Sequence, residues 1–229
     1  MTQILDVADA YALWAETYPP YAHNALMLAE ERAFMTLLPP DMRGLSVLDI
    51  GCGSGRYLKR IMARGAAQTT GLDLSRPMLK RAYIEHPDLV ESSASHIPLR
   101  NDVADCVVCA LTLGHIESLG NALAEISRML KPSGLLVASD FHPIGAAFGW
   151  QRTFKHQNQR YAVRHFTHTL DDWRRACQAA SLTVEAHMEA FVDPRDVLSG
   201  ATVDPRALDY PVAHVLGLRK RPGEIQVSA

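Results

Sequence analysis

The stretch VLDIGCGSG, residues 47–55, decides the fold. Residues 46–50 form a short apolar run that predicts a buried strand. The glycines that follow tolerate positive φ and let a ligand approach the backbone without a Cβ in the way. Residues 56–64 then have the composition of a helix, which Gly65 ends. A strand that passes through a glycine turn into a helix predicts the first unit of an α/β sheet.

The same alternation of strand and helix continues to about residue 140. Strands are predicted over residues 69–74, 89–92, 104–113 and 135–139, and helices over 77–86, 119–130 and 170–180. Regular alternation predicts a doubly wound, mainly parallel sheet with helices on both faces. Residues 183–191 and 212–218 are expected to close it as an antiparallel pair at the C-terminal edge.

Two other segments flank this core. Residues 6–38 have helical spacing with a break at Pro19–Pro20, so residues 1–40 are predicted to be a helical lid or lead-in to a main domain over 41–229. The alternation of strands and helices stops at about residues 141–170, which are rich in glycine, aromatic residues, glutamine and histidine. We expect this segment to be an insertion over the functional site.

Composition limits the function. The formal net charge of −2 gives no general attraction for a polyanion, so no nucleic-acid partner is expected. The first residues carry acids where a secretory signal has basic residues, and no apolar run approaches the ~20 residues of a membrane helix. We therefore expect a cytoplasmic protein with no membrane partner, and a homodimer is compatible with the sequence. Cys106 and Cys109 lack a second pair, so no metal site is expected.

Two acids lie at the carboxyl ends of predicted strands. Asp49 precedes the glycine turn, and Asp73 lies in the sequence GLDLS at residues 71–75. The carboxyl ends of neighbouring parallel strands share one crevice, where a carboxylate can accept both hydroxyls of a ribose. A dinucleotide site would need GxGxxG, but Arg56 occupies the position of its third glycine. The pattern therefore favours a different ribose-containing cofactor.

DIGCGSG followed by GLDLS resembles the first two motifs of the class I S-adenosylmethionine-dependent methyltransferases. The resemblance continues through residues 105–111 and 125–134 and covers roughly residues 44–140. It implies S-adenosyl-L-methionine as cofactor. Residues 11–18 also resemble the lid helix of small-molecule members, among them malonyl-carrier-protein O-methyltransferases and quinone C-methyltransferases. No Asn-Pro-Pro-Tyr type motif follows the fourth strand, which favours transfer to oxygen or carbon of a small molecule.

The resemblance also implies where the cofactor lies. Its amino-acid end falls at the first strand and turn, its ribose at Asp73, its adenine beside Leu74 and the segment at residues 93–95, and its sulfonium at Leu111. In that segment Ser93 stands where the family often has Asp. Tyr11 and Tyr18 of the lid would close over it, and Trp14 would face the acceptor. The expected cofactor-binding residues are Asp49, Gly51, Cys52, Gly53, Asp73, Leu74, Ser93, Ala94, Ser95, Leu111, Tyr11 and Tyr18.

Methyl transfer requires in-line alignment of a nucleophile, and a phenol, enol or carbon acid also requires a base. His115, after the fourth strand, is the first candidate base and His142, after the fifth, is the second. The candidate residues for binding the acceptor are Trp14, Arg164 and His165. A carboxylate acceptor would need no base but a cationic clamp, for which Arg152, Arg160 and Arg164 are available. A non-catalytic sensor or assembly subunit that binds the cofactor is the alternative from another class.

Overall fold

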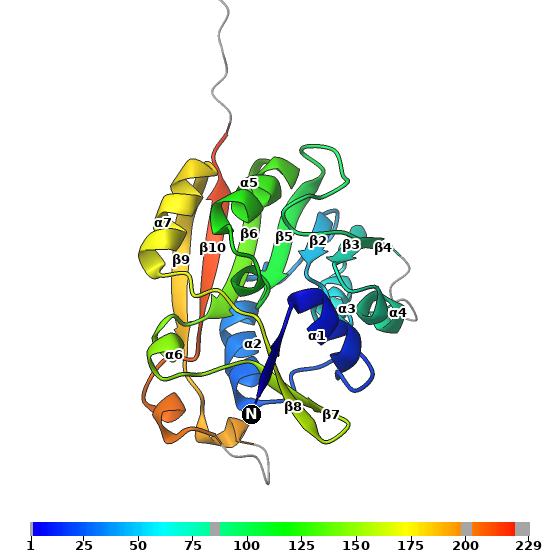
Figure 1. Cartoon of the computed structure of the whole chain (residues 1–229). Helices are drawn as coiled ribbons and strands as arrows, with labels where there is room; N and C mark the ends of the chain where they lie inside the picture. The colour runs from blue at the N-terminus through cyan, green and yellow to red at the C-terminus, as the bar shows by residue number, and fades with distance from the viewer. Residues whose placement is uncertain (1, 83–87, 198–202, 223–229) are drawn as a thin grey trace, which may run out of the picture.

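The computed structural model describes residues 2–82, 88–197 and 203–222. Its centre is a seven-stranded sheet in the order β4-β3-β2-β5-β6-β10-β9 (Figure 1). The strands are β2 (Ser46–Ile50), β3 (Gln68–Asp73), β4 (Leu89–Glu91), β5 (Ala104–Ala110), β6 (Leu130–Phe141), β9 (Leu182–Ala190) and β10 (Ala213–Lys220). Pairs from β4 to β6 are parallel, whereas β10 is antiparallel to both β6 and β9. The predicted doubly wound sheet with an antiparallel strand near its C-terminal edge is confirmed.

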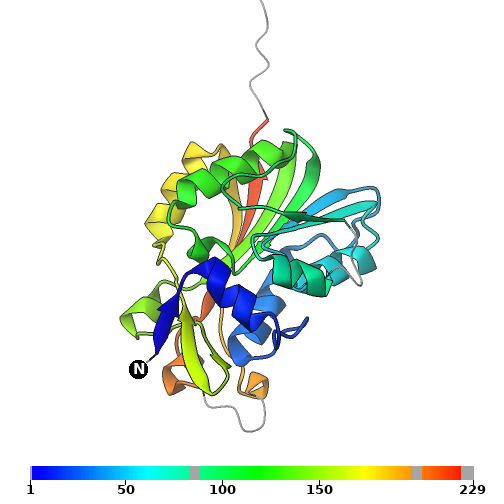
Figure 2. The same cartoon turned by 45° about the vertical axis from the view of Figure 1, so that its right-hand side comes forward.

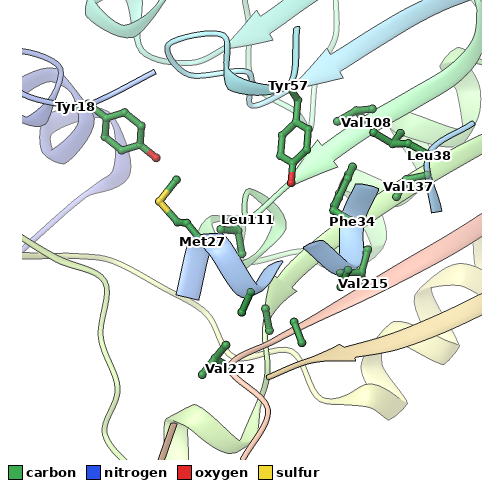
Figure 3. Packing of buried hydrophobic residues seen from close by; sticks show 14 of the residues in the cluster. Tyr18, Met27, Phe34, Leu38, Tyr57, Val108, Leu111, Val137, Val212 and Val215 are labelled. Carbon is green, nitrogen blue, oxygen red and sulfur yellow. The ribbon is translucent and has the colours of Figure 1, made fainter. Parts of the chain in front are cut away.

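Helices cover both faces of the sheet. On one face lie α2 (Ala25–Leu37) and α3 (Arg56–Ala63), and on the other lie α5 (Leu119–Met129) and α7 (Leu170–Ala179). Successive residues of a strand point to opposite faces, so Cys106 packs on the α2 side and Cys109 on the α5 side. Burial on both sides explains why β5 is apolar from Cys106 to Ala110. Figure 3 shows the α2 side, where Phe34 of the helix packs among Val108, Val137 and Val215 of the strands.

Several predicted boundaries differ from the structure. The strand predicted over residues 104–113 ends at Ala110, as β5. Helix α4 spans Arg76–Ala82, and residues 83–86 of its predicted length lie outside the described residues. Residues 131–134, which separate the predicted helix over 119–130 from the predicted strand over 135–139, lie within β6, which follows α5 directly. These residues form an irregularity in the pairing of β5 with β6, where Ser133 adopts a φ of +62°.

The lid and the insertion form a second, smaller sheet. Strand β1 (Gln3–Leu5) pairs in parallel with β8 (Gln159–Val163), which forms a hairpin with β7 (Thr153–His156). The remaining elements are α1 (Val7–Trp14), α6 (Ile144–Ala147) and the short 3-10 helices η1 (Leu113–His115), η2 (Pro194–Asp196) and η3 (Pro205–Leu208). Figure 2 shows β1, α1 and the hairpin side by side. The first 40 residues thus divide, since α1 joins the insertion while α2 packs on the main sheet.

Candidate active site

A cavity of about 330 Å³ lies at the carboxyl ends of β2, β3 and β5, between the sheet and α1. The structure brings together residues that are far apart in the sequence, from the lid, the glycine turn, the second strand end and the insertion. Of the residues predicted from the sequence, those that line it are Tyr11, Tyr18, Asp49, Gly51, Cys52, Gly53, Asp73, Leu74, Ser93, Ala94, Ser95, Leu111 and His115.

The glycine turn has no room for a side chain at Gly51. Gly51 has a φ of +73°, and a Cβ there would lie 2.1 Å from the Oγ1 of Thr112, far inside van der Waals contact. Gly53 has a φ of +56°. The backbone N–H of Gly51 donates to the carbonyl oxygen of Leu72 at 2.7 Å, which fastens the turn to the end of β3. The turn therefore presents bare backbone to the cavity.

The two predicted acids are buried at this turn in different ways. Asp73 accepts hydrogen bonds from the backbone N–H groups of Gly53 at 2.8 Å and Ser75 at 2.7 Å. Burial raises the pKa of Asp73, and these two bonds lower it. Asp49 is 2% exposed, and its Oδ2 has no hydrogen-bond partner among the described residues. Burial raises the pKa of Asp49 to about 7, opposed by the nearby Arg56. An orphaned carboxylate oxygen facing a cavity favours a cationic ligand group.

The far end of the cavity has a mixed wall. Leu74 is 48% exposed beside it, and the Oγ of Ser93 accepts from the backbone N–H of Ser95 at 3.2 Å. Ser92, which the sequence analysis did not select, also lines the cavity, and its Oγ is buried without a partner within the described part of the chain. Leu111 at the end of β5 adopts a φ of +52°, unusual for leucine. The far end of the cavity is thus lined by the serines of residues 92–95.

The lid is fastened to the cavity through His115. Its Nδ1 lies 2.9 Å from the carbonyl oxygen of Arg164, so Nδ1 carries the proton and donates. Its Nε2 then accepts from the hydroxyl of Tyr11 at 3.0 Å. Burial, together with the charge of Arg152, lowers the pKa of His115 to about 4. His115 is therefore neutral near pH 7, with its one basic nitrogen already occupied.

Of the three arginines that the sequence offers as a clamp, Arg152 is the one that lines this cavity. It is 7% exposed, and among the described residues no carboxylate pairs with it. Its Nη2 donates to the hydroxyl of Tyr18 at 2.7 Å, while its Nε is buried without a partner in the described chain. Its guanidinium carbon lies 5.2 Å from the ring centroid of Trp14 and 5.9 Å from that of Tyr11. A buried cation in an aromatic surround attracts an anion.

Four predicted site residues lie outside this cavity. Trp14 is 8% exposed and stacks on Phe154 at a centroid distance of 4.8 Å, so it forms part of the core. His142, Arg164 and His165 line a second cavity of about 370 Å³, to which Arg152 also contributes. In the described residues, no cluster of His, Cys, Asp and Glu side chains is arranged to hold a metal ion.

Comparison with known proteins identifies the family. The family described as "Methyltransferase domain" matches residues 48–138. The chain is 30% identical over 196 residues to a malonyl-[acyl-carrier protein] O-methyltransferase of Salmonella typhimurium, covering 81% of this chain and 76% of that protein. The chain belongs to the S-adenosylmethionine-dependent methyltransferases.

Other relatives of this methyltransferase are more distant or match over less of their length. An uncharacterized protein of Haemophilus influenzae is 29% identical over 66% of each chain. A ubiquinone/menaquinone biosynthesis C-methyltransferase of Bartonella bacilliformis is 32% identical, and the match spans 46% of this chain and 44% of that protein. The methyltransferase thus spans about half to two thirds of these two relatives.

Solved structures agree with the fold. The putative S-adenosylmethionine dependent methyltransferase from Listeria monocytogenes superposes with a TM-score of 0.70 at 21% identity, covering 85% of this chain and 97% of that one. An N-methyltransferase from Burkholderia thailandensis, solved with S-adenosylhomocysteine, is 23% identical with a TM-score of 0.56 over 86% of this chain and 78% of that one. Across the described residues of this methyltransferase, every helix is too short or too polar to span a membrane.

Proposed function

We propose that this methyltransferase transfers a methyl group from S-adenosyl-L-methionine to a carboxylate oxygen of an acid. The buried guanidinium of Arg152, which pairs with no carboxylate of the described residues, carries this proposal, because it lies in the cavity that Asp49 and Asp73 also line. A neutral phenol or carbon acid would leave that cation without a counterion, whereas a carboxylate can accept two of its N–H groups.

The cavity fits the cofactor. The orphaned Oδ2 of Asp49 suits the cofactor's ammonium group, and the bare backbone at Gly51 and Gly53 leaves room for its amino-acid end. Asp73, held by two backbone amides, would accept the ribose hydroxyls. Residues 92–95 would surround the adenine, with Leu74 against its face. When bound, the cofactor supplies an electrophilic methyl group on a sulfonium.

The chain's own part in the reaction is alignment and exclusion of water. Arg152 would orient the acceptor carboxylate, and its aromatic neighbours Tyr11 and Tyr18, which line the cavity, would keep water from the reacting atoms. A lone pair of the carboxylate oxygen would form the new bond to the methyl carbon while the carbon–sulfur bond breaks. The electron pair of that broken bond would stay on the sulfur, so the products would be a methyl ester and S-adenosylhomocysteine. No proton moves in this step, so no base is required.

His115 fits this reaction as a structural contact rather than as a base. Its Nε2 accepts from Tyr11, and a pKa near 4 makes it a weak proton acceptor at neutral pH. The name of the Salmonella relative supports an acid acceptor bound to a carrier, whereas the name of the Bartonella relative supports a carbon acceptor. The geometry at Arg152 and His115 favours the acid.

The proposal is tested by whether base releases the transferred methyl group from the product. Enzyme and cofactor with a tritiated methyl group are incubated with aliphatic mono- and dicarboxylic acids and with malonyl-coenzyme A. Methyl esters release volatile methanol in base, whereas methyl ethers and C-methyl products do not. We expect base-labile label with at least one acid. Label found only in base-stable products, or tight cofactor binding with no transfer to any of these acids, would overturn the proposal.

A variant pair then assigns Arg152. Arg152→Met should raise the KM for the methylated acid at least tenfold and leave S-adenosylhomocysteine affinity unchanged. The matched control is Arg160→Met, because Arg160 is exposed. If Arg152→Met instead weakens the binding of S-adenosylhomocysteine but not that of 5′-methylthioadenosine, which lacks the carboxylate, then Arg152 holds the carboxylate of the cofactor. The argument for an acid acceptor would then fail.

A further inference from the structure

A buried carboxylate on α2 connects three elements of the site. Glu30 is fully buried, and its Oε2 accepts from the Nη2 of Arg56 at 3.0 Å. The hydroxyl of Tyr57 donates to both oxygens of Glu30, at 3.1 and 3.0 Å. The hydroxyl of Ser139 donates to Oε1 at 2.6 Å. Glu30 itself does not line the cavity.

Two of these partners control the glycine turn. Arg56 and Tyr57 are the first residues of α3, immediately after Gly55, and both line the cavity. The guanidinium carbon of Arg56 lies 4.4 Å from the centroid of the Tyr57 ring, so the two side chains are held as a unit. Figure 3 shows the Tyr57 ring reaching from the start of α3 toward α2. Glu30 therefore fixes the point at which the turn becomes a helix.

The third partner controls the end of β5. A hydroxyl has one donor and two acceptor positions. Because Ser139 donates to Glu30, its Oγ is oriented to accept from the backbone N–H of Leu111 at 3.1 Å. The carbonyl oxygen of Ser139 accepts from the same N–H at 3.0 Å. These contacts hold Leu111 at its φ of +52°, a conformation that leucine does not keep unaided.

We propose that Glu30 is a positioning residue of the methyl-transfer site, which holds the glycine turn through Arg56 and Tyr57 and the strained end of β5 through Ser139. The proposal rests on the cofactor placement given above and does not depend on which acceptor is methylated. Within the described part of the chain, loss of the Glu30 charge would leave the longer 3.5 Å contact to Glu31 as the remaining ion pair of Arg56, and it would release the orientation of the Ser139 hydroxyl.

The neighbouring Glu31 offers a matched control. It also pairs with Arg56, and with Arg60, but among the described residues it forms no hydrogen bond with Tyr57 or Ser139. The variants Glu30→Gln, Ser139→Ala and Glu31→Gln are compared as folded proteins, well below their unfolding temperatures. S-adenosylhomocysteine affinity is measured by calorimetry, and the Leu111 amide is followed by ¹⁵N NMR without ligand.

We expect Glu30→Gln to lower the affinity for S-adenosylhomocysteine at least tenfold and to shift the Leu111 amide resonance. Ser139→Ala should shift that resonance with less than threefold loss of affinity, because it breaks only the branch to β5. Glu31→Gln should change neither quantity. If Glu30→Gln does not fold, Tyr57→Phe and Ser139→Ala test the two branches separately. Wild-type affinity and an unmoved Leu111 resonance in Glu30→Gln, or equal losses in Glu31→Gln, would overturn the proposal. A failure of the cofactor placement would show instead as unchanged affinity in Asp73→Ala.

Discussion

The two walls of the cavity are built by different means. The strand-end wall, made of Asp49, the glycine turn and Asp73, is held by bonds that backbone N–H groups donate, from Gly51 to the carbonyl oxygen of Leu72 and from Gly53 to the carboxylate of Asp73, 20 residues away. The lid wall is held by side chains from distant segments. Tyr11 meets His115 across 104 residues, and Arg152 meets Tyr18 across 134.

The two walls differ in how far their residues can change without a change in the fold. The strand-end wall follows from the sheet and the glycine turn, so any ligand that suits it is common to the fold. The lid wall depends on individual side chains of a lid and an insertion, which can change without altering the sheet. We expect substitutions in the first wall to act on the cofactor strongly and those in the second to act on it weakly.

The largest effect is expected from Gly51→Ala. Its Cβ would collide with Thr112 and would have to adopt positive φ, so the turn must move. We expect more than about a hundredfold loss of S-adenosylhomocysteine affinity, or roughly 3 kcal/mol, by calorimetry. Gly44→Ala is the matched control, because Gly44 has a φ of +80° and open space around its Cβ. It should cost about 1–2 kcal/mol of stability and no affinity. Equal affinity losses in both variants would contradict the steric argument.

Asp73→Ala should have the next largest effect. Loss of a charge-assisted bond to the ribose costs about 1.5–3 kcal/mol, which is roughly a 10- to 150-fold loss of S-adenosylhomocysteine affinity. Asp105→Ala is the control, because Asp105 is an acid of the same sheet that bonds Lys131 and the backbone of Ser46 at the other end of β2. Undiminished affinity in Asp73→Ala would remove the ribose site from this position.

The strand-end wall could be predicted from the sequence because its residues are contiguous with the strands that place them. Asp49 and Asp73 occupy the strand ends in the structure, at the cavity edge, as the alternation implied. The hairpin of the insertion was not predicted. Its turn places Gln157 and Asn158 at positive φ, but Gln-Asn is a weaker signal for such a turn than Asn-Gly.

The lid wall and the buried network could not be predicted because they depend on tertiary packing. In the sequence, Glu30 and Glu31 are equivalent charged residues of a helix, and only the packing of α2 buries the first completely. Arg152 was one of three candidate arginines until the structure buried it beside Tyr18. Trp14 was assigned to the acceptor because of its aromatic character, and in the structure it packs on Phe154 instead.

A smaller effect, dependent on pH, is expected from His115→Gln. Folding lowers the pKa of His115 from 6.5 to about 4, so the folded state disfavours the proton. The stabilisation by neutral His115 is therefore complete above pH 6.5 and is lost as the pH falls toward 4. Discounted for partial solvent access at the cavity, the change is about 1–2 kcal/mol. Urea unfolding at intervals from pH 7.5 to 4.5 measures it. The difference in unfolding free energy between wild type and variant should shrink with acid, and a constant difference would show that His115 titrates alike in both states.

The smallest effect on the cofactor is expected from Trp14→Phe, which tests the boundary between the lid wall and the core. Trp14 is nearly buried and stacks on Phe154 with an interplanar angle of 8°, and it does not line the cavity. The smaller ring leaves a void under the lid, so we expect a loss of about 1 kcal/mol in stability. S-adenosylhomocysteine affinity should change less than about twofold, or 0.4 kcal/mol. The comparison variant is Tyr11→Phe, which keeps its ring but loses the hydroxyl bonded to His115 at the cavity. A larger affinity loss in Trp14→Phe than in Tyr11→Phe would show that the core beneath the lid, rather than its cavity face, governs cofactor binding.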